Sequence, residues 1–125
     1  MKHNTFAWIE IPVNDMARAS KFYEKVFNVS LQQVDFGGML MAWFPNAGEE
    51  ATGATGTLIK QESYVPSMEG PMVYFYSKNV QNELDRVVGA GGEIYQEKTM
   101  ISPDHGYMGV FIDSEGNRIA LHSKE

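Results

Sequence analysis

The sequence of 125 residues contains no cysteine. Disulfide bonds, thiolate nucleophiles and zinc or iron–sulfur sites built from cysteine are therefore excluded. Cationic residues are also scarce, with 10 Lys and Arg against 16 Asp and Glu and a formal net charge of −6. Proteins that bind nucleic acid cluster Lys and Arg to neutralise phosphates, so this composition argues against a nucleic-acid partner.

Long apolar runs are missing as well. No stretch approaches the ~18 consecutive apolar residues of a membrane span, and the chain enters its first strand pattern without a signal-like apolar run. We therefore expect no membrane partner and a cytoplasmic location. Hydrophobic residues still make up 43% of the chain, which is enough for a packed globular domain.

The chain repeats one order of predicted elements. Hydrophobic periodicity predicts a strand, a helix and two further strands in each half. The first set covers residues 6–13, 14–27, 37–44 and 53–59, and the second covers 72–76, 79–89, 106–112 and 117–122. A module of about 60 residues buries too little surface to be stable alone. We therefore expect a single domain over residues 1–125 whose modules share a core, with module one at about 4–62, a linker at about 61–71 and module two at about 71–124.

Residues at the ends of these elements support the pattern. Asp15 and Asn79 can act as N-caps, since their side chains accept hydrogen bonds from the first turn of a helix. Asn28 is expected to end the first helix, and the glycine-rich segment 89–92 the second. Residues 113–117, with the sequence DSEGN, are expected to form a tight turn between the last two strands.

Two motifs frame the chain. It opens with WIEIPVND at residues 8–15, followed by Arg18 and the pair FY at 22–23, and it closes with DSEGNRI at residues 113–119. These motifs, in this order and over about residues 6–123, resemble the vicinal oxygen chelate superfamily, which includes glyoxalase I, bleomycin-resistance proteins and extradiol dioxygenases. The resemblance implies an α+β fold in which two paired βαβββ modules form a curved mixed sheet around a cavity, the glyoxalase/bleomycin-resistance fold.

The resemblance also locates the expected metal ligands. In metal-using members, His or Glu side chains from the first and last strands of each module converge on one divalent ion. The matching positions here are Trp8, Met72 and Ala120, and the fourth falls in residues 56–60, which contain no His, Asp or Glu. Indole, thioether and methyl groups cannot replace imidazole and carboxylate ligands. The prediction is therefore no metal site and no cofactor.

Two side chains are candidates for acid–base chemistry. Strand alternation places Glu10 and His122 on the cavity side, where a buried carboxylate needs a partner such as His122, Arg118, a tyrosine hydroxyl or a ligand. Imidazole can transfer protons near neutral pH. The alternative interpretations are a paired or solvent-reaching carboxylate and a partly exposed histidine at a strand end. A two-residue shift of the match would instead make Glu10 and His122 metal ligands, with Ni, Zn, Fe or Mn as the candidate metal.

The predicted pocket is rich in aromatic and methionine side chains. Such a surface can stack on a planar ligand or hold an apolar cation, and it can equally fill a core or form a dimer interface. The residues assigned to the ligand-binding pocket are Trp8, Glu10, Trp43, Met72, Tyr74, Tyr76, His105, Tyr107 and His122.

The leading hypothesis is a metal-free glyoxalase/bleomycin-resistance-like protein that binds a small, partly apolar or aromatic metabolite in the cavity between the modules. One alternative is a metal-dependent lyase, isomerase or dioxygenase of the same superfamily. Another is a metal-free acid–base enzyme that uses Glu10 and His122. A third is a module whose aromatic face binds a partner, including a second copy in a homodimer.

Overall fold

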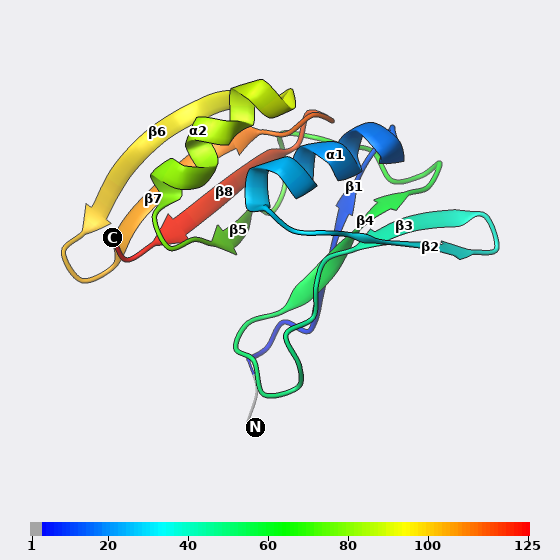
Figure 1. The fold of residues 1–125 in the computed structure, drawn as a ribbon, viewed down its shortest axis with the longest axis horizontal. Coiled ribbons are helices and arrows are strands. Elements are labelled where there is room, and N and C mark those ends of the chain that lie inside the picture. The colour runs from blue at the N-terminus through cyan, green and yellow to red at the C-terminus, as the bar shows by residue number, and fades with distance from the viewer. Residues whose placement is uncertain (1–3) are drawn as a thin grey trace.

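The computed structural model describes residues 4–125, which form two βαβββ modules (Figure 1). The predicted α+β fold with two such modules is confirmed. The first module contains β1 (Trp8–Pro12), α1 (Met16–Phe27), β2 (Gln32–Phe36), β3 (Met39–Trp43) and β4 (Thr55–Lys60). The second contains β5 (Val73–Tyr76), α2 (Val80–Ala90), β6 (Glu93–Ser102), β7 (Gly106–Ile112) and β8 (Arg118–Ser123).

Each module forms its own four-stranded mixed sheet. The strand order is β1-β4-β3-β2 in the first sheet and β5-β8-β7-β6 in the second. In each sheet the first strand of the module runs parallel to the last, and the other neighbours are antiparallel. The curved sheet expected from the sequence is thus divided into two sheets, with β1 and β5 at one edge of each.

Two of the strands, β2 and β6, were not located from the sequence. Both are outer edge strands, and most of their residues are exposed on both faces. β6 also contains register shifts against β7. A strand of this kind does not need the alternation of apolar and polar residues that marks a half-buried strand, so its sequence carries little signal.

The helix ends follow the sequence prediction. Asp15 caps α1 by accepting a hydrogen bond from Arg18 N–H at 3.0 Å, and Asn79 caps α2 in the same way. Asn28 ends α1 in the left-handed region with φ 53°, and Gly91 ends α2 with φ 108°.

The two helices lie on the same side of the sheets and pack against each other (Figure 1). Arg86 Nε of α2 donates to Val26 O of α1 at 2.8 Å. The buried apolar residues form one cluster that spans both modules. Its members include Ile11, Ala19, Phe22, Tyr23, Val26 and Leu58 from the first module and Leu84, Val87, Phe111, Ile119 and Leu121 from the second. Neither module therefore has a core of its own.

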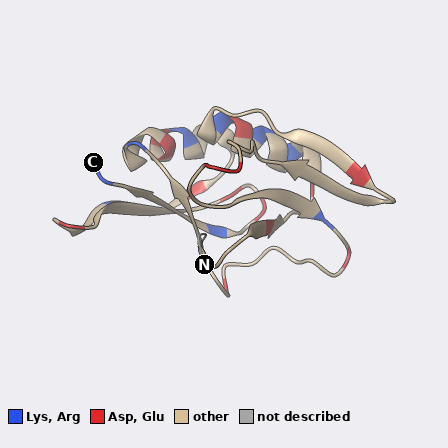
Figure 2. Ribbon diagram, turned by 90° about the horizontal axis from the view of Figure 1, so that it is seen from below, with Lys and Arg blue, Asp and Glu red and all other residues tan. Residues whose placement is uncertain are grey.

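Charged residues of both signs lie on the helices, while much of the strand ribbon carries none (Figure 2). None of the helices within residues 4–125 is both long and apolar enough to span a membrane.

Candidate functional site

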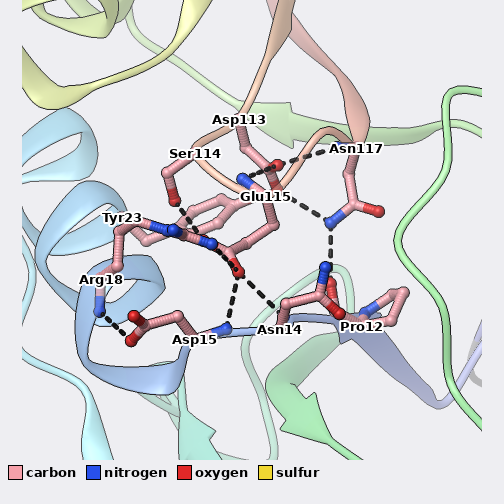
Figure 3. A network of polar contacts seen from close by, with 9 residues as sticks. All are labelled: Pro12, Asn14, Asp15, Arg18, Tyr23, Asp113, Ser114, Glu115 and Asn117. Carbon is pink, nitrogen blue, oxygen red and sulfur yellow. Dashed lines mark hydrogen bonds and ion pairs between the residues drawn. The ribbon is translucent and has the colours of Figure 1, made fainter.

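The turn between β7 and β8 holds the second module against the start of α1. Glu115 Oε1 accepts hydrogen bonds from the backbone N–H groups of Asn14 and Asp15, each at 2.8 Å (Figure 3). Its Oε2 lies 2.7 Å from Arg18 Nε and accepts from Ser114 Oγ at 3.0 Å. The Glu115 side chain is 0% exposed, so it is a buried carboxylate whose partners come mainly from the other module.

These partners set the charge state of Glu115. Burial by itself raises the pKa of the carboxyl, but the hydrogen bonds from Arg18, Asp15, Asn14 and Ser114 outweigh it and lower the pKa to about 2. The hydrogen bond and the charge attraction between Arg18 and Glu115 also raise the pKa of the Arg18 guanidinium. Glu115 is therefore ionised throughout the neutral range.

Asp113, the first residue of the turn, extends the network to the core. Its Oδ2 accepts from the Tyr23 hydroxyl at 2.6 Å, and its Oδ1 accepts from the backbone N–H groups of Glu115 and Asn117 at 2.8 Å. Asn117 Nδ2 donates to Pro12 O at 2.8 Å, at the end of β1. Burial, followed by the neighbouring Asp113, raises the pKa of the Tyr23 hydroxyl. We call this set of Arg18, Tyr23, Asp113, Glu115 and Asn117 the inter-module latch.

A cavity of about 1140 Å³ lies at the opposite end of the module junction, and we call it the inter-module cavity. The latch contacts the end of β1 and the start of α1, whereas the cavity is lined by residues 4–6 before β1, by Ile9 and Ile11 within it, and by Phe27 and Val29 around the end of α1. The loop between β3 and β4, with β5 and the end of β8, completes the wall.

The apolar part of this cavity is a group of aromatic rings. Phe27 stacks on Phe75 with ring centroids 4.3 Å apart, and Phe44 meets Phe75 edge-on at 5.5 Å. All three rings are half-buried and line the cavity, so they present apolar surface that nothing in the described chain covers completely. Ile9, Ile11, Val29 and Val73 continue this surface. We call Phe27, Phe44 and Phe75 the aromatic floor.

The rim of the inter-module cavity is polar. Ser77 Oγ donates to Glu83 Oε1, and Glu83 Oε2 lies 3.5 Å from Arg86 Nη2. His122 Nε2 lies 2.6 Å from the backbone oxygen of His105. Because a carbonyl oxygen only accepts, Nε2 of His122 must carry the hydrogen.

A second cavity, of about 690 Å³, lies beside the segment that connects the modules, and we call it the linker cavity. Its wall includes Trp8 and Glu10 of β1, Met72 and Tyr74 around the start of β5, and Arg118 at the start of β8. Glu10 is exposed, and its Oε2 accepts from Trp8 Nε1 at 3.4 Å.

The residues assigned to the pocket from the sequence are divided between these places. Tyr76 and His122 line the inter-module cavity, Trp8, Glu10 and Met72 line the linker cavity, and Tyr74 lines both. Glu10 and His122 are therefore not brought together.

Trp43, His105 and Tyr107 line neither cavity. Trp43 packs edge-on against Trp8, with centroids 6.2 Å apart. His105 lies in the β6–β7 turn, where its Nδ1 is 2.9 Å from Ser102 Oγ. The Lys98 Nζ atom lies over the Tyr107 ring, 4.5 Å from the ring centroid.

The residues at the expected ligand positions do not fit a divalent metal. Trp8 and Met72 offer an indole and a thioether, and Ala120 is fully buried with a methyl group only. In β4 the residue beside Glu10 is Thr57, whose hydroxyl donates to backbone oxygens. Within residues 4–125, no three His, Asp or Glu side chains gather in a way that could hold a metal ion.

Residues 5–121 match the family model described as Glyoxalase/Bleomycin resistance protein/Dioxygenase superfamily. The chain belongs to this superfamily. The resemblance drawn from the opening and closing motifs is thus confirmed. A glyoxylase-like domain-containing protein of Didymella fabae is 26% identical over 124 residues, which cover 95% of this chain and 93% of the relative.

Solved structures of the superfamily share the fold at low identity. A glyoxalase/bleomycin resistance protein from Albidiferax ferrireducens T118 superposes with a TM-score of 0.74 and 15% identity, covering 98% of this chain and 100% of that one. Glyoxalase I from Zea mays gives a TM-score of 0.70 and 19% identity over 94% of this chain. The chain spans 45% of the maize protein's length. At these identities the similarity shows the fold alone.

The sequence did not predict two groups of residues, the inter-module latch and the aromatic floor. Residues 113–117 were predicted as a turn, but the contacts of Asp113 and Glu115 with residues about a hundred positions earlier carry no local signal. Two acidic side chains within one short turn, Asp113 and Glu115, are the signal that could have found the latch, since such carboxylates need partners if they are buried. The aromatic floor was missed because Phe75 alternates with Tyr74 and Tyr76, which were assigned to the pocket, and therefore belongs to the opposite face of the strand.

Proposed function

We propose that this superfamily member binds a small, partly apolar or aromatic molecule in the inter-module cavity, without a metal ion. The observation that carries the proposal is the half-buried aromatic floor formed by Phe27, Phe44 and Phe75. Small-molecule sites are concave and mostly apolar, with a few polar groups, and typically measure about 300–1,000 Å³. The inter-module cavity, at about 1140 Å³, is of this kind and this scale.

The energetic argument follows from the exposed ring surface. Removing apolar surface from water stabilises by about 25 cal/mol per Å², so a ligand that covers roughly 100 Å² of the floor gains about 2.5 kcal/mol from that surface. The described chain leaves part of each of the three rings of the floor exposed. A bound apolar molecule would complete this part of the core.

The metal-free part of the proposal rests on the donor set. Trp8, Met72 and Ala120 are the residues at the ligand positions that the resemblance implies, and none of the three can coordinate a hard or borderline divalent ion. The proposal therefore assigns binding to the aromatic floor and not to coordination chemistry.

The test is a fluorescence titration with N-phenyl-1-naphthylamine, a neutral aromatic probe. Val73 lines both cavities and is not part of the buried core cluster, so Val73→Trp fills cavity space without displacing the core. We expect Val73→Trp to weaken probe binding at least tenfold. Tyr95→Trp is the matched control, since Tyr95 is exposed and lines neither cavity.

A further variant distinguishes the two cavities. Trp8 lines only the linker cavity, so Trp8→Ala should leave probe affinity unchanged. Unaltered binding by Val73→Trp would refute the site, and loss of binding in Trp8→Ala would move it to the linker cavity. Circular dichroism and thermal unfolding confirm that each variant is folded.

A further inference from the structure

The rim of the inter-module cavity carries an unbalanced positive charge. Lys78 and Glu83 are the only Lys, Arg, Asp or Glu residues among the described residues that line it. The Glu83 side chain is 12% exposed, accepts a hydrogen bond from Ser77 Oγ and forms an ion pair with Arg86. Its negative charge is therefore already compensated by its own helix.

Lys78 has no such partner. It is exposed, and within residues 4–125 its ammonium group makes no hydrogen bond or ion pair. α2 begins at Val80, two residues later, so the positive end of the helix dipole lies at the same rim. In a chain with a net charge of −6, this rim is a local site of positive charge.

The other rim groups are less able to hold an anion. The Ser77 hydroxyl donates to Glu83, and Nε2 of His122 donates to the backbone oxygen of His105. Each of these hydrogens is already used, and Lys78 is the only Lys or Arg among the described residues that line the cavity, so its ammonium is the cationic donor left for a ligand.

From these contacts we infer that the ligand is an organic anion. Its aromatic or apolar body lies on the aromatic floor, and one carboxylate or similar acid group is held by Lys78. The inference rests on the proposed binding function and adds the chemical class of the ligand. Lys78 follows Phe75 by three residues, so their Cα atoms are at most about 11 Å apart. This span suits a compact body of one ring or a few fused or linked rings.

Two probes with the same aromatic body test the charge requirement. N-phenyl-1-naphthylamine is neutral, and 8-anilinonaphthalene-1-sulfonate adds one anionic sulfonate. We expect the wild type to bind the sulfonate about two- to fivefold more tightly at low ionic strength, as one partly exposed charge pair allows. The preference should shrink as salt approaches 1 M, because screening weakens exposed pairs.

Three variants locate the charge. Lys78→Gln should remove the preference by weakening sulfonate binding two- to fivefold, with no change for the neutral probe, and Lys78→Arg should retain it. Lys21→Gln is the matched control, since Lys21 lies on the exposed face of α1, lines neither cavity and makes the same change in net charge. Val73→Trp should weaken binding of both probes.

The outcomes separate this inference from the proposed function. If the neutral probe binds in a manner sensitive to Val73→Trp, but the sulfonate gains nothing from Lys78, the anionic class is wrong and the binding function stands. An equal effect of Lys21→Gln and Lys78→Gln would also overturn the anionic site, because it would reflect net charge alone. If neither probe responds to Val73→Trp, the binding function itself fails.

Discussion

Replacing Glu115 by glutamine should destabilise the fold by removing the charge at the centre of the latch. The folded state lowers the pKa of Glu115 from 4.5 to about 2. A difference of one pKa unit corresponds to about 1.4 kcal/mol, so the ionised carboxylate contributes about 3 kcal/mol to the free energy of unfolding at neutral pH. The Glu115 side chain is buried, but the Arg18 side chain is 54% exposed, so solvent screening reduces this contribution to about 2 to 3 kcal/mol.

The dependence on pH has a defined sign. A carboxyl whose folded-state pKa is lowered contributes its full stability above its ordinary pKa and loses it as the pH falls toward the folded-state value. The contribution of Glu115 should therefore be complete at pH 7, fall to about 1.5 kcal/mol at pH 3 and nearly vanish at pH 2. Glu115→Gln removes the titration and should abolish this part of the acid sensitivity.

Urea denaturation at pH 7 and pH 3 measures both effects. We expect the wild type to exceed Glu115→Gln by about 2 to 3 kcal/mol at pH 7 and by about half as much at pH 3. Glu97→Gln makes the same charge change on an exposed residue of β6 and should alter stability by less than about 0.5 kcal/mol. A difference for Glu115→Gln that is below 0.5 kcal/mol, or that does not change with pH, would refute the reasoning.

Three further predictions test other parts of the structure. Tyr23→Phe removes the hydroxyl that donates to Asp113 at 2.6 Å. The free energy of unfolding, measured by urea denaturation, should fall by about 1 to 3 kcal/mol, as expected for a hydrogen bond to a charged group. An unchanged free energy of unfolding would mean that this hydrogen bond contributes nothing. Gly56→Ala should cost more than about 3 kcal/mol or prevent folding, since an added Cβ would lie 2.1 Å from Ile9 O. Gly89→Ala, with its nearest neighbour at 3.5 Å, should instead stabilise α2 by up to about 1 kcal/mol, and thermal unfolding of the pair checks the contrast. Addition of Ni²⁺, Zn²⁺, Fe²⁺ or Mn²⁺ should leave the melting temperature unchanged. If elemental analysis finds one bound ion per chain, and the ion raises the melting temperature with its concentration as mass action requires, the metal-free proposal is wrong.

Local chemistry allowed much of the fold to be predicted. The caps Asp15 and Asn79, the left-handed end at Asn28 and the turn at residues 113–117 each follow from side-chain groups that act within a few residues. The strands β2 and β6 could not be located in this way, because most of their residues are exposed and impose no apolar pattern.

The candidate site was less predictable because it depends on how the modules sit relative to each other. Strand alternation separates Trp8 and Glu10 from Ile9 and Ile11, but it cannot state which face borders a cavity. In the structure, β1 contributes to two cavities, and the inter-module cavity meets Ile9 and Ile11 with Phe75 from the other module. Such a meeting of segments far apart in the chain has no signature in a single sequence.

The latch and the cavity are linked through one residue. The Tyr23 hydroxyl donates to Asp113 of the latch, while its ring lies 6.0 Å from Phe75 and 5.6 Å from Phe44 of the aromatic floor. The position of the floor therefore depends on the same buried hydrogen bond that fixes the β7–β8 turn. A change in the latch that shifts Tyr23 must alter the shape of the cavity, because close-packed rings transmit such shifts. Under the proposed function, ligand preference can thus be changed by latch residues that do not line the cavity, with the cavity wall itself unaltered in sequence.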